Sequence, residues 1–508
     1  MPVLQNNKIM IPYLNDTEKL KVGLNLLGLR NPSELLFTQL LPGLNNVTLR
    51  IRYYSFYCWI ISSYYSRCKS IKVTPSRENF NQFIRRAEYL LAVIEASNEN
   101  NGGLPGISYA VNHIDDFSEY VDVANSADIA NGHSTYWANP GGALSQYYVA
   151  SLLDMGLLGY VKEDSSLINI TSDDDSFVNG ESLCRAFDNS IGKEGSTKFL
   201  TCIENGRVKS DELDVLAQVF NMHKLHQDKD ECKLLIDFLL QKDYPGLPEC
   251  ETFRRRETIK YLLIYCGNER NIKSDLDFAE FMHDRCLDET YQDDTAIGWY
   301  AYYLNDMWQY NFTEIFSYIL ELLKSKSRIT VSQISQEVQN DITQIYTSKN
   351  VRDAISCEVM DIDESTIESQ SIACQAFYRI LKLVAINKDF LYDKLQSYGL
   401  TSYNYFIFSQ KIENNTSSLD QFVRDVIRDD IIYRHYALSF QKQQYTGIAT
   451  QKFIIENDVI TFCASYSATH TSPRILSLRN FLFDLNMVDD EWNLTKYGKD
   501  ILTSMSDD

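Results

Sequence analysis

Apolar residues recur every three or four positions along most of this chain, the spacing that lines one face of an α-helix. The clearest segment follows Asn45-Asn46, which can cap a helix from Val47 to about Arg67. Apolar and aromatic side chains nearly encircle this segment, so the pattern predicts a buried helix. The same periodicity predicts helices at 32–41, 76–96, 213–225, 230–240, 253–266, 276–286, 312–323 and 370–386.

Strand-like alternation is rare and gathers near the C-terminus. Thr446–Ile455 and Val459–Tyr466 flank Asn457-Asp458, which predicts a β-hairpin. The stretch Asn98–Gly106 is rich in Asn and Gly and predicts a loop at a domain boundary. No fixed period of about 20 to 50 residues recurs, which argues against a regular solenoid and leaves an irregular helical array as the alternative.

Two distant segments share one pattern. In the first, Pro140-Gly141-Gly142 precedes a predicted helix at Ala143–Met155, and Gly156 can end that helix in the left-handed conformation. Leu157–Val161 and Leu167–Thr171 then have the composition of two short strands around a polar turn.

The second segment begins after Pro473, and its helical face ends where Asn486 takes the cap position. A strand, an acidic turn, a second strand and a last helix capped by Thr495 are expected to follow. The two segments agree in polarity and cap, Leu152–Leu158 against Leu482–Val488. An unrelated helix followed by a hairpin would give the same pattern and is the alternative.

Each segment resembles the last helix and β-wing of a winged-helix domain, over about 30 residues. The expected fold is therefore mainly α: a multi-domain helical protein with two winged-helix-like modules and a small C-terminal β-hairpin. We expect a basic N-terminal helical region at 1–106, a winged-helix-like module at 107–192, an acidic helical middle domain at 193–400 and a C-terminal winged-helix-like domain at 401–508.

The polar residues on the helix of each module indicate whether it could recognise DNA bases, because a recognition helix offers Arg, Lys, Asn or Gln to base edges. The first module has no cation on this face, which favours protein contact. Its polar residues are Ser145, Gln146, Ser151 and Asp154. The second module offers Arg474, Arg479 and Asn480, followed by the acidic run Asp489–Glu491.

Charge narrows the classes of function. A formal charge of −21 over 508 residues argues against a protein coated all over in nucleic acid. Residues 1–100 nevertheless hold 12 Lys and Arg against 7 Asp and Glu, whereas the remainder holds 36 against 62. A surface that faces a polyanion is therefore expected in the first hundred residues. The alternative is an ordinary charge bias between domains.

Cations surround the Tyr-rich helix at Arg50, Arg52, Arg67, Lys69 and Lys72. Cations interleaved with aromatic rings can bind single-stranded nucleic acid by stacking and phosphate contact. A core helix whose arginine stems reach outward is the alternative that the aromatic spacing favours. The candidate nucleic-acid-binding residues are these five together with Arg474 and Arg479.

Eleven cysteines without a Cys-x-x-Cys pair, and no expected signal sequence, favour a cytoplasmic location. Apolar stretches such as Tyr53–Ile61 fall short of the roughly 20 residues of a bilayer span, so no membrane contact is expected. No catalytic residue, metal site or cofactor is expected. His223, His226 and Cys232 lack a second ligand pair for zinc, and Glu280 with His283 lacks the second Glu-x-x-His step of a di-iron bundle.

The run Leu40–Arg50, followed by Tyr53-Tyr54 and Tyr57–Trp59, resembles uncharacterised bacterial proteins of mobile or anti-phage defence loci. The resemblance implies a context without a mechanism. The leading hypothesis is a non-catalytic component of a bacterial defence assembly that docks a protein partner, such as an ATPase or nuclease subunit, and touches nucleic acid through its basic region. The alternatives are a carboxylate-dependent nuclease or other hydrolase, and a winged-helix transcriptional regulator.

Overall fold

The computed structural model describes residues 25–45, 47–97, 105–113, 119–129, 135–172, 177–223, 225, 230–241, 249–268, 274–326, 328–388, 395 and 397–507. Most of the loop predicted at Asn98–Gly106 lies outside these residues. The protein is mainly helical, with 66% helix and 7% strand, which confirms the expected class. None of the described helices has both the length and the apolarity that a bilayer span requires.

The described chain forms two compact units, and each is built from stretches that are distant in sequence. Unit 1 takes the described residues of 1–37 and 282–471, and unit 2 takes those of 38–281 and 472–508. This division cuts across the four consecutive regions expected above. Composition along a sequence shows where a segment changes character, but it does not show which distant segments pack together.

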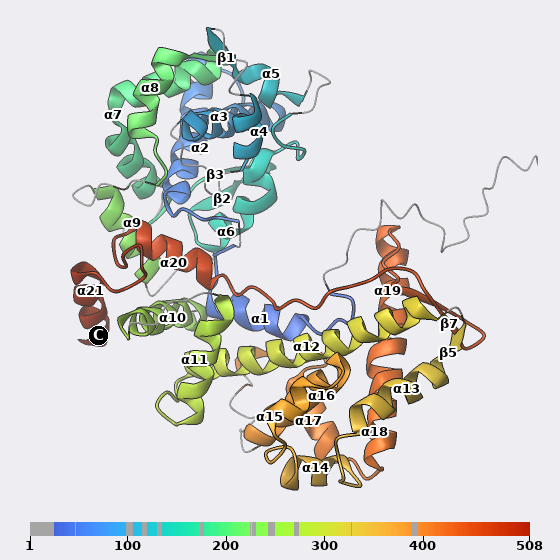
Figure 1. Ribbon diagram of the computed structural model, residues 1–508. Helices are drawn as coiled ribbons and strands as arrows, with labels where there is room; N and C mark the ends of the chain where they lie inside the picture. Colours follow the sequence, from blue (N-terminus) through green and yellow to red (C-terminus); the bar gives the residue numbers. More distant parts are fainter. Residues whose placement is uncertain are drawn as a thin grey trace, which may run out of the picture. The chain divides into compact units, whose positions relative to one another are not determined.

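Every residue in the first half of helix α2 (Arg52–Ile71), from Arg52 to Ile61, is buried. Figure 1 shows this helix among the other helices of unit 2. As predicted, its side chains are buried on most sides, and it packs against α3 (Arg77–Ser97) and α7 (Gly180–Asn205). Aromatic rings dominate the contact with α7, where the ring centroids of Trp59 and Phe187 are 5.4 Å apart. Such rings contribute the largest buried areas of a core.

Helix α2 begins at Arg52, later than the predicted start at Val47. The side chain of Asn45 accounts for the difference. Its Oδ1 accepts hydrogen bonds from the backbone N–H groups of Val47 at 2.9 Å and Thr48 at 2.7 Å. Asn45 therefore closes a local turn before the helix and does not cap it.

Unit 2 also holds two small antiparallel sheets, β1 (Tyr120–Asp122) with β4 (Arg207–Lys209) and β2 (Leu158–Val161) with β3 (Asp164–Ile170). The first predicted module helix begins as a π-helical turn, η4 (Leu144–Tyr148), and continues as α6 (Val149–Asp154). The other helices of this unit are α4 (Ile107–His113), α5 (Val123–Ala127), α8 (Ser210–Val219), α9 (Asp230–Leu240), α10 (Glu249–Gly267), α20 (Ile475–Asp484) and α21 (Lys496–Asp507).

Unit 1 is organised around α12 (Asp294–Ser325), which includes the predicted helix at 312–323 and is buried on most of its sides. It packs against α16 (Ile372–Ile386) and α17 (Tyr405–Glu413). The remaining helices of this unit are α13 (Val331–Thr343), α14 (Val351–Cys357), α15 (Glu364–Glu368), α18 (Leu419–Asp425), η6 (Val426–Tyr433) and α19 (Arg434–Thr446). Two of the boundaries between the units fall within described helices, α1 (Asn31–Leu40) and α11 (Asp275–Leu287).

The predicted C-terminal hairpin is present as β6 (Phe453–Glu456) and β7 (Val459–Phe462), shorter than expected. Asn457 and Asp458 both have positive φ, as a two-residue type I′ hairpin turn requires. A strand that the sequence did not reveal, β5 (Ile329–Thr330), pairs with β7 to complete a three-stranded antiparallel sheet.

His435 joins three segments of unit 1. Its ring is fully buried; Nε2 accepts from the Lys452 N–H at 3.0 Å, and Nδ1 lies 3.2 Å from the Leu26 carbonyl oxygen. Both ring nitrogens therefore form hydrogen bonds while the ring is neutral, because Nδ1 carries the proton and donates it and Nε2 accepts. Burial disfavours the charged form and lowers the pKa of His435 to about 4.

This lowered pKa predicts acid sensitivity of unit 1. In the unfolded chain a histidine titrates near pH 6.5. The stabilisation that the neutral His435 provides is therefore complete above pH 6.5 and is lost as the pH falls toward 4. The free energy of unfolding should fall by about 3 kcal/mol over this range. Urea unfolding of the wild type and of His435→Gln at neutral pH and near pH 4 measures the effect. The variant should show the smaller loss on acidification, and equal losses would contradict the prediction.

Candidate interaction surfaces

The two helix–hairpin modules end their helices in the same way. Gly156 and Asn486 have left-handed backbone, with φ of 68° and 57°. The next amide donates to the carbonyl five residues earlier in each module, at 2.9 Å for Leu157 and 2.8 Å for Met487. This 6→1 hydrogen bond, together with a bond from the left-handed residue itself to a carbonyl three residues earlier, defines a Schellman helix end.

Thr171 and Thr495 occupy matching positions beyond the hairpins. Each hydroxyl donates to the carbonyl of the left-handed residue, at 2.7 Å in the first module and 2.6 Å in the second. Each hydroxyl also accepts from the amide of a glycine in the following helix, Gly180 at 3.1 Å and Gly498 at 2.9 Å. A Cβ on these glycines would lie 2.2 Å and 2.0 Å from a backbone carbonyl oxygen of the same module, so only glycine fits.

The wings of the two modules differ. The first is the β2–β3 sheet, with an irregularity between Tyr160 and Val161. The second is reduced to one bridge, between Val488 and Leu494. The sequence predicted the cap at Thr495, and its hydroxyl does accept from the Gly498 N–H of the last helix. The sequence did not indicate the matching pair of Thr171 and Gly180, because turns of unequal length separate the two pairs from the helix ends.

Arg52 is a core residue, so it is no longer a candidate for contact with nucleic acid. Its side chain is 2% exposed, and its Nε donates to Glu231 at 3.1 Å while Nη1 donates to the Asn221 carbonyl at 2.7 Å. Arg50, with 18% of its side chain exposed, pairs with the buried Asp484 at 2.7 Å. A charge in a core must be paired in this way, because its desolvation is costly.

Three candidate cations do lie together, at the C-terminal end of α2. Lys69 and Lys72 are exposed, and Arg67 forms an ion pair with Glu204 of α7. Arg67 also lines a groove of about 540 Å³ between α2 and α7. Helix α7 is broken at Gly192, whose φ of 72° and ψ of 163° are open only to glycine, and the groove is bordered by residues on both sides of this break.

The two arginines of the second module lie elsewhere. Arg474 precedes α20 with a φ of 70°, and its Nη1 donates to the Leu41 carbonyl at 3.4 Å. Burial lowers the pKa of Arg474. Arg479 lies over the ring of Trp492, with 3.7 Å between its Cζ and the ring centroid. The structure thus unites Arg67, Lys69 and Lys72 and separates the other candidates from them.

The metal-ligand candidates are dispersed among the described residues, which contain no group of three or more His, Cys, Asp and Glu suited to a metal. His226 lies outside them. The Nε2 of His223 is 3.6 Å from Oε2 of the buried Glu95, and burial lowers the pKa of His223 to about 4 and raises that of Glu95 to about 7. His283 stacks on Tyr300 and lies 3.0 Å from the Asn387 side chain.

Asp306 and His470 form a contact that no sequence pattern indicated, because they are 164 positions apart. The buried Asp306 carboxylate lies 2.6 Å from Nδ1 of His470 and accepts from the backbone N–H of Thr471 at 2.8 Å. The His470 ring stacks on Tyr310 with centroids 3.9 Å apart. These contacts fix the extended segment after β7 against α12.

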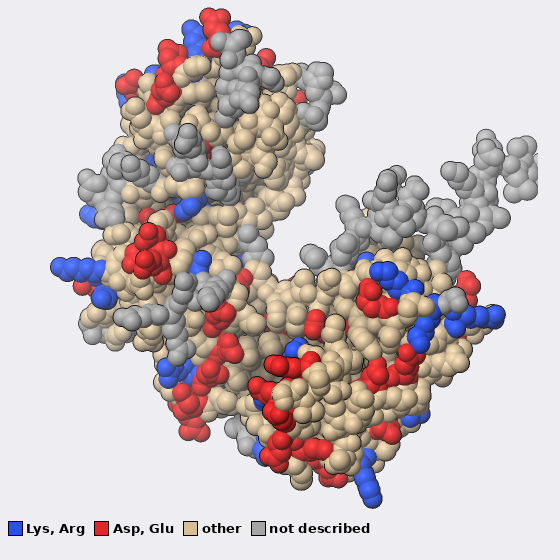
Figure 2. Space-filling model, in the orientation of Figure 1, with Lys and Arg blue, Asp and Glu red and all other residues tan. Residues whose placement is uncertain are grey.

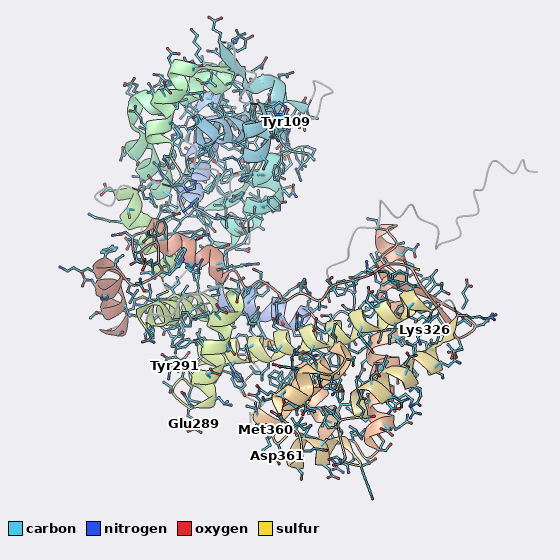
Figure 3. All side chains as sticks on the ribbon, in the orientation of Figure 1. Tyr109, Glu289, Tyr291, Lys326, Met360 and Asp361 are labelled. Atoms are coloured by element: carbon cyan, nitrogen blue, oxygen red, sulfur yellow. The ribbon has the colours of Figure 1, made fainter. Side chains whose placement is uncertain are left out.

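Unit 1 carries exposed apolar side chains among carboxylates. Leu287, Met360 and Ile386 are 43%, 57% and 38% exposed. Figure 3 places Glu289 beyond α11 and Asp361 close to Met360, and Figure 2 shows acidic side chains around both places. The acidic members are Asp284, Asp288, Glu289, Asp361, Asp363 and Glu364. We call these carboxylates and the three apolar residues the acidic–apolar face.

Helix α16 connects the two halves of this face. Lys382 Nζ donates to Glu364 at 3.0 Å, and Asn387, which caps the same helix, lies beside His283 of α11. Five positions of helix separate these contacts, a rise of about 7 Å. The two acidic stretches therefore contact neighbouring turns near the C-terminal end of α16, on sides about 140° apart, and Ile386 is exposed in the same turns.

No protein-family model, curated protein or solved structure matches the chain.

The glycines after the two hairpins give a prediction about the modules. Gly180→Ala and Gly498→Ala should each lower the free energy of unfolding of unit 2 by about 2 kcal/mol or more, because the new Cβ overlaps a carbonyl oxygen. Gly159→Ala is the matched control, since its Cβ would meet only a Thr171 methyl group at 4.0 Å. Urea unfolding compares the three, and similar values for all would refute the shared geometry.

Proposed function

We propose that the chain is a non-catalytic interaction component that docks a protein partner through the acidic–apolar face of unit 1. The observation that carries the proposal is the exposure of Leu287, Met360 and Ile386 among carboxylates. Large apolar side chains that remain exposed in a group mark contact surfaces, and methionine adapts to varied partners. The surrounding carboxylates select a partner surface that is basic, and they speed its approach.

The two modules are proposed to be winged-helix-like, and the matching helix ends and Thr–Gly contacts support this. Their cations are used within the protein, Arg474 on a backbone carbonyl and Arg479 on Trp492. This favours a role in protein contact over reading of DNA bases, for which free donors in a groove are needed. A defence or mobile-element assembly is the context that the N-terminal resemblance implies.

A second candidate function is contact with single-stranded nucleic acid at the end of α2. The exposed Lys69 and Lys72 beside Arg67 favour it, because clustered cations release counterions from a phosphate backbone. The groove beside Arg67 also presents the exposed hydroxyl of Ser66, which can donate to phosphate, whereas the hydroxyls of Ser63 and Ser70 donate to backbone carbonyls.

The docking proposal predicts that charge reversal within the face weakens capture of the partner. Met360→Lys with Asp361→Lys should weaken capture from the native host by about tenfold or more, because it replaces an apolar contact and reverses a charge. Tyr445→Lys is the control, since Tyr445 is 83% exposed elsewhere in unit 1. Quantitative co-purification measures both, and equal capture by the two variants would contradict the proposal.

The nucleic-acid candidate predicts a change in salt dependence. Lys69→Glu with Lys72→Glu should reduce the slope of log K against log salt for a single-stranded oligonucleotide by about 1.4, which corresponds to two lost phosphate contacts. Lys499→Glu, at an exposed site on α21, should leave the slope unchanged. Fluorescence anisotropy over a salt series gives the slopes. Incubating the same oligonucleotides with Mg²⁺ or Mn²⁺ tests the hydrolase alternative, since the proposal expects no cleavage.

A further inference from the structure

The C-terminal module carries a second exposed surface. Phe483 of α20 is 38% exposed, and its ring centroid is 5.9 Å from that of Trp492. Arg479, one turn earlier on the same helix, places its guanidinium over the Trp492 ring, with 3.7 Å between Cζ and the ring centroid. These three side chains, from α20 and from the turn that follows it, form what we call the aromatic platform.

Trp492 is held in a strained conformation. Its φ of 68° lies in the left-handed region, which a bulky side chain rarely adopts. The turn is closed by the Trp492 N–H to the Asp489 carbonyl at 3.1 Å and by the Asp489 N–H to the Asn493 carbonyl at 2.9 Å. Glycine or asparagine would make the same turn with less strain, so the turn alone does not account for a tryptophan. Strain retained for one side chain is characteristic of functional surfaces.

The charges around the platform identify the kind of partner. Trp492 is preceded in its turn by three acidic residues, Asp489, Asp490 and Glu491. Two carboxylates of α11, Asp275 and Asp277, interact electrostatically with Arg479. A phosphate backbone is repelled by such carboxylates. A cationic side chain is attracted to them, whereas the cation–π position on Trp492 is held by Arg479.

We propose that the aromatic platform docks a basic segment of a protein partner. The inference rests on the proposed function, that the chain is an interaction component, and it adds a second contact site with the chemistry of its occupant. A lysine or arginine of the partner pairs with Asp490 or Glu491 beside the Trp492 ring, whose face Arg479 covers. An apolar neighbour in the partner covers Phe483.

The test uses the full chain and a synthetic helical peptide of alternating Lys and Leu faces that carries a photo-crosslinking residue. Mass spectrometry should locate crosslinks within residues 479–492. Trp492→Gly should weaken peptide binding by about tenfold or more, and Asp490→Lys with Glu491→Lys should do the same. Tyr497→Ala is the matched control, because Tyr497 is equally exposed at 38% on α21, and it should change the affinity by less than about twofold.

Thermal unfolding separates docking from a structural role. Trp492→Gly removes the strain together with the ring, so Tm should move by less than about 4 °C. A larger fall in Tm with unchanged peptide affinity would overturn the inference, as would crosslinks confined to other regions. Displacement of the peptide by oligothymidylate, dependent on Trp492, would assign the platform to nucleic acid and overturn it too. A native partner whose capture depends on Met360 but not on Trp492 would overturn the platform and leave the proposed function standing.

Discussion

The burial of the first half of α2 on nearly every side is the constraint on which unit 2 depends. A helix that is enclosed in this way must pair each of its polar groups inside the protein. Arg52 does so with Glu231, and Tyr57 donates to Glu88 of α3 at 3.0 Å. Glu88 in turn accepts from the backbone N–H of Leu144 at 2.7 Å, so one carboxylate ties α2, α3 and the first module together. Burial raises the pKa of Glu88, and these hydrogen bonds act in the opposite direction.

The same enclosure determines where contact with other molecules can occur. Cations near the buried half of α2 are drawn into internal pairs, as Arg50 is with Asp484. Cations past the last buried turn remain in solvent, as Lys69 and Lys72 do. Solvent-exposed cations and internally paired cations are therefore close together in the sequence, and the register of one helix decides between them.

Periodicity was sufficient to predict most of the helices, including the buried character of α2 and the C-terminal hairpin around Asn457-Asp458. It was sufficient to pair the two modules, because helix ends at Gly156 and Asn486 have a local signature. It did not predict the fate of Arg52, whose partner is 179 positions away, or the β5 strand, which is defined by pairing with β7. Such features depend on tertiary packing, which a single sequence does not encode in any local window.

The construction of unit 1 from an N-terminal segment and a stretch that begins at residue 282 has a consequence for its biosynthesis. Arg30 donates to the carbonyl of Thr469 at 2.8 Å, across 439 positions. At translation rates of roughly 5 to 20 residues per second, the earlier residue waits about 20 to 90 s for the later one to be made. Closure of unit 1 therefore follows the synthesis of its last segment, and it costs a large loop entropy in one late step. A chaperone that shields the nascent N-terminal segment during this interval would act at the point of greatest exposure to misfolding.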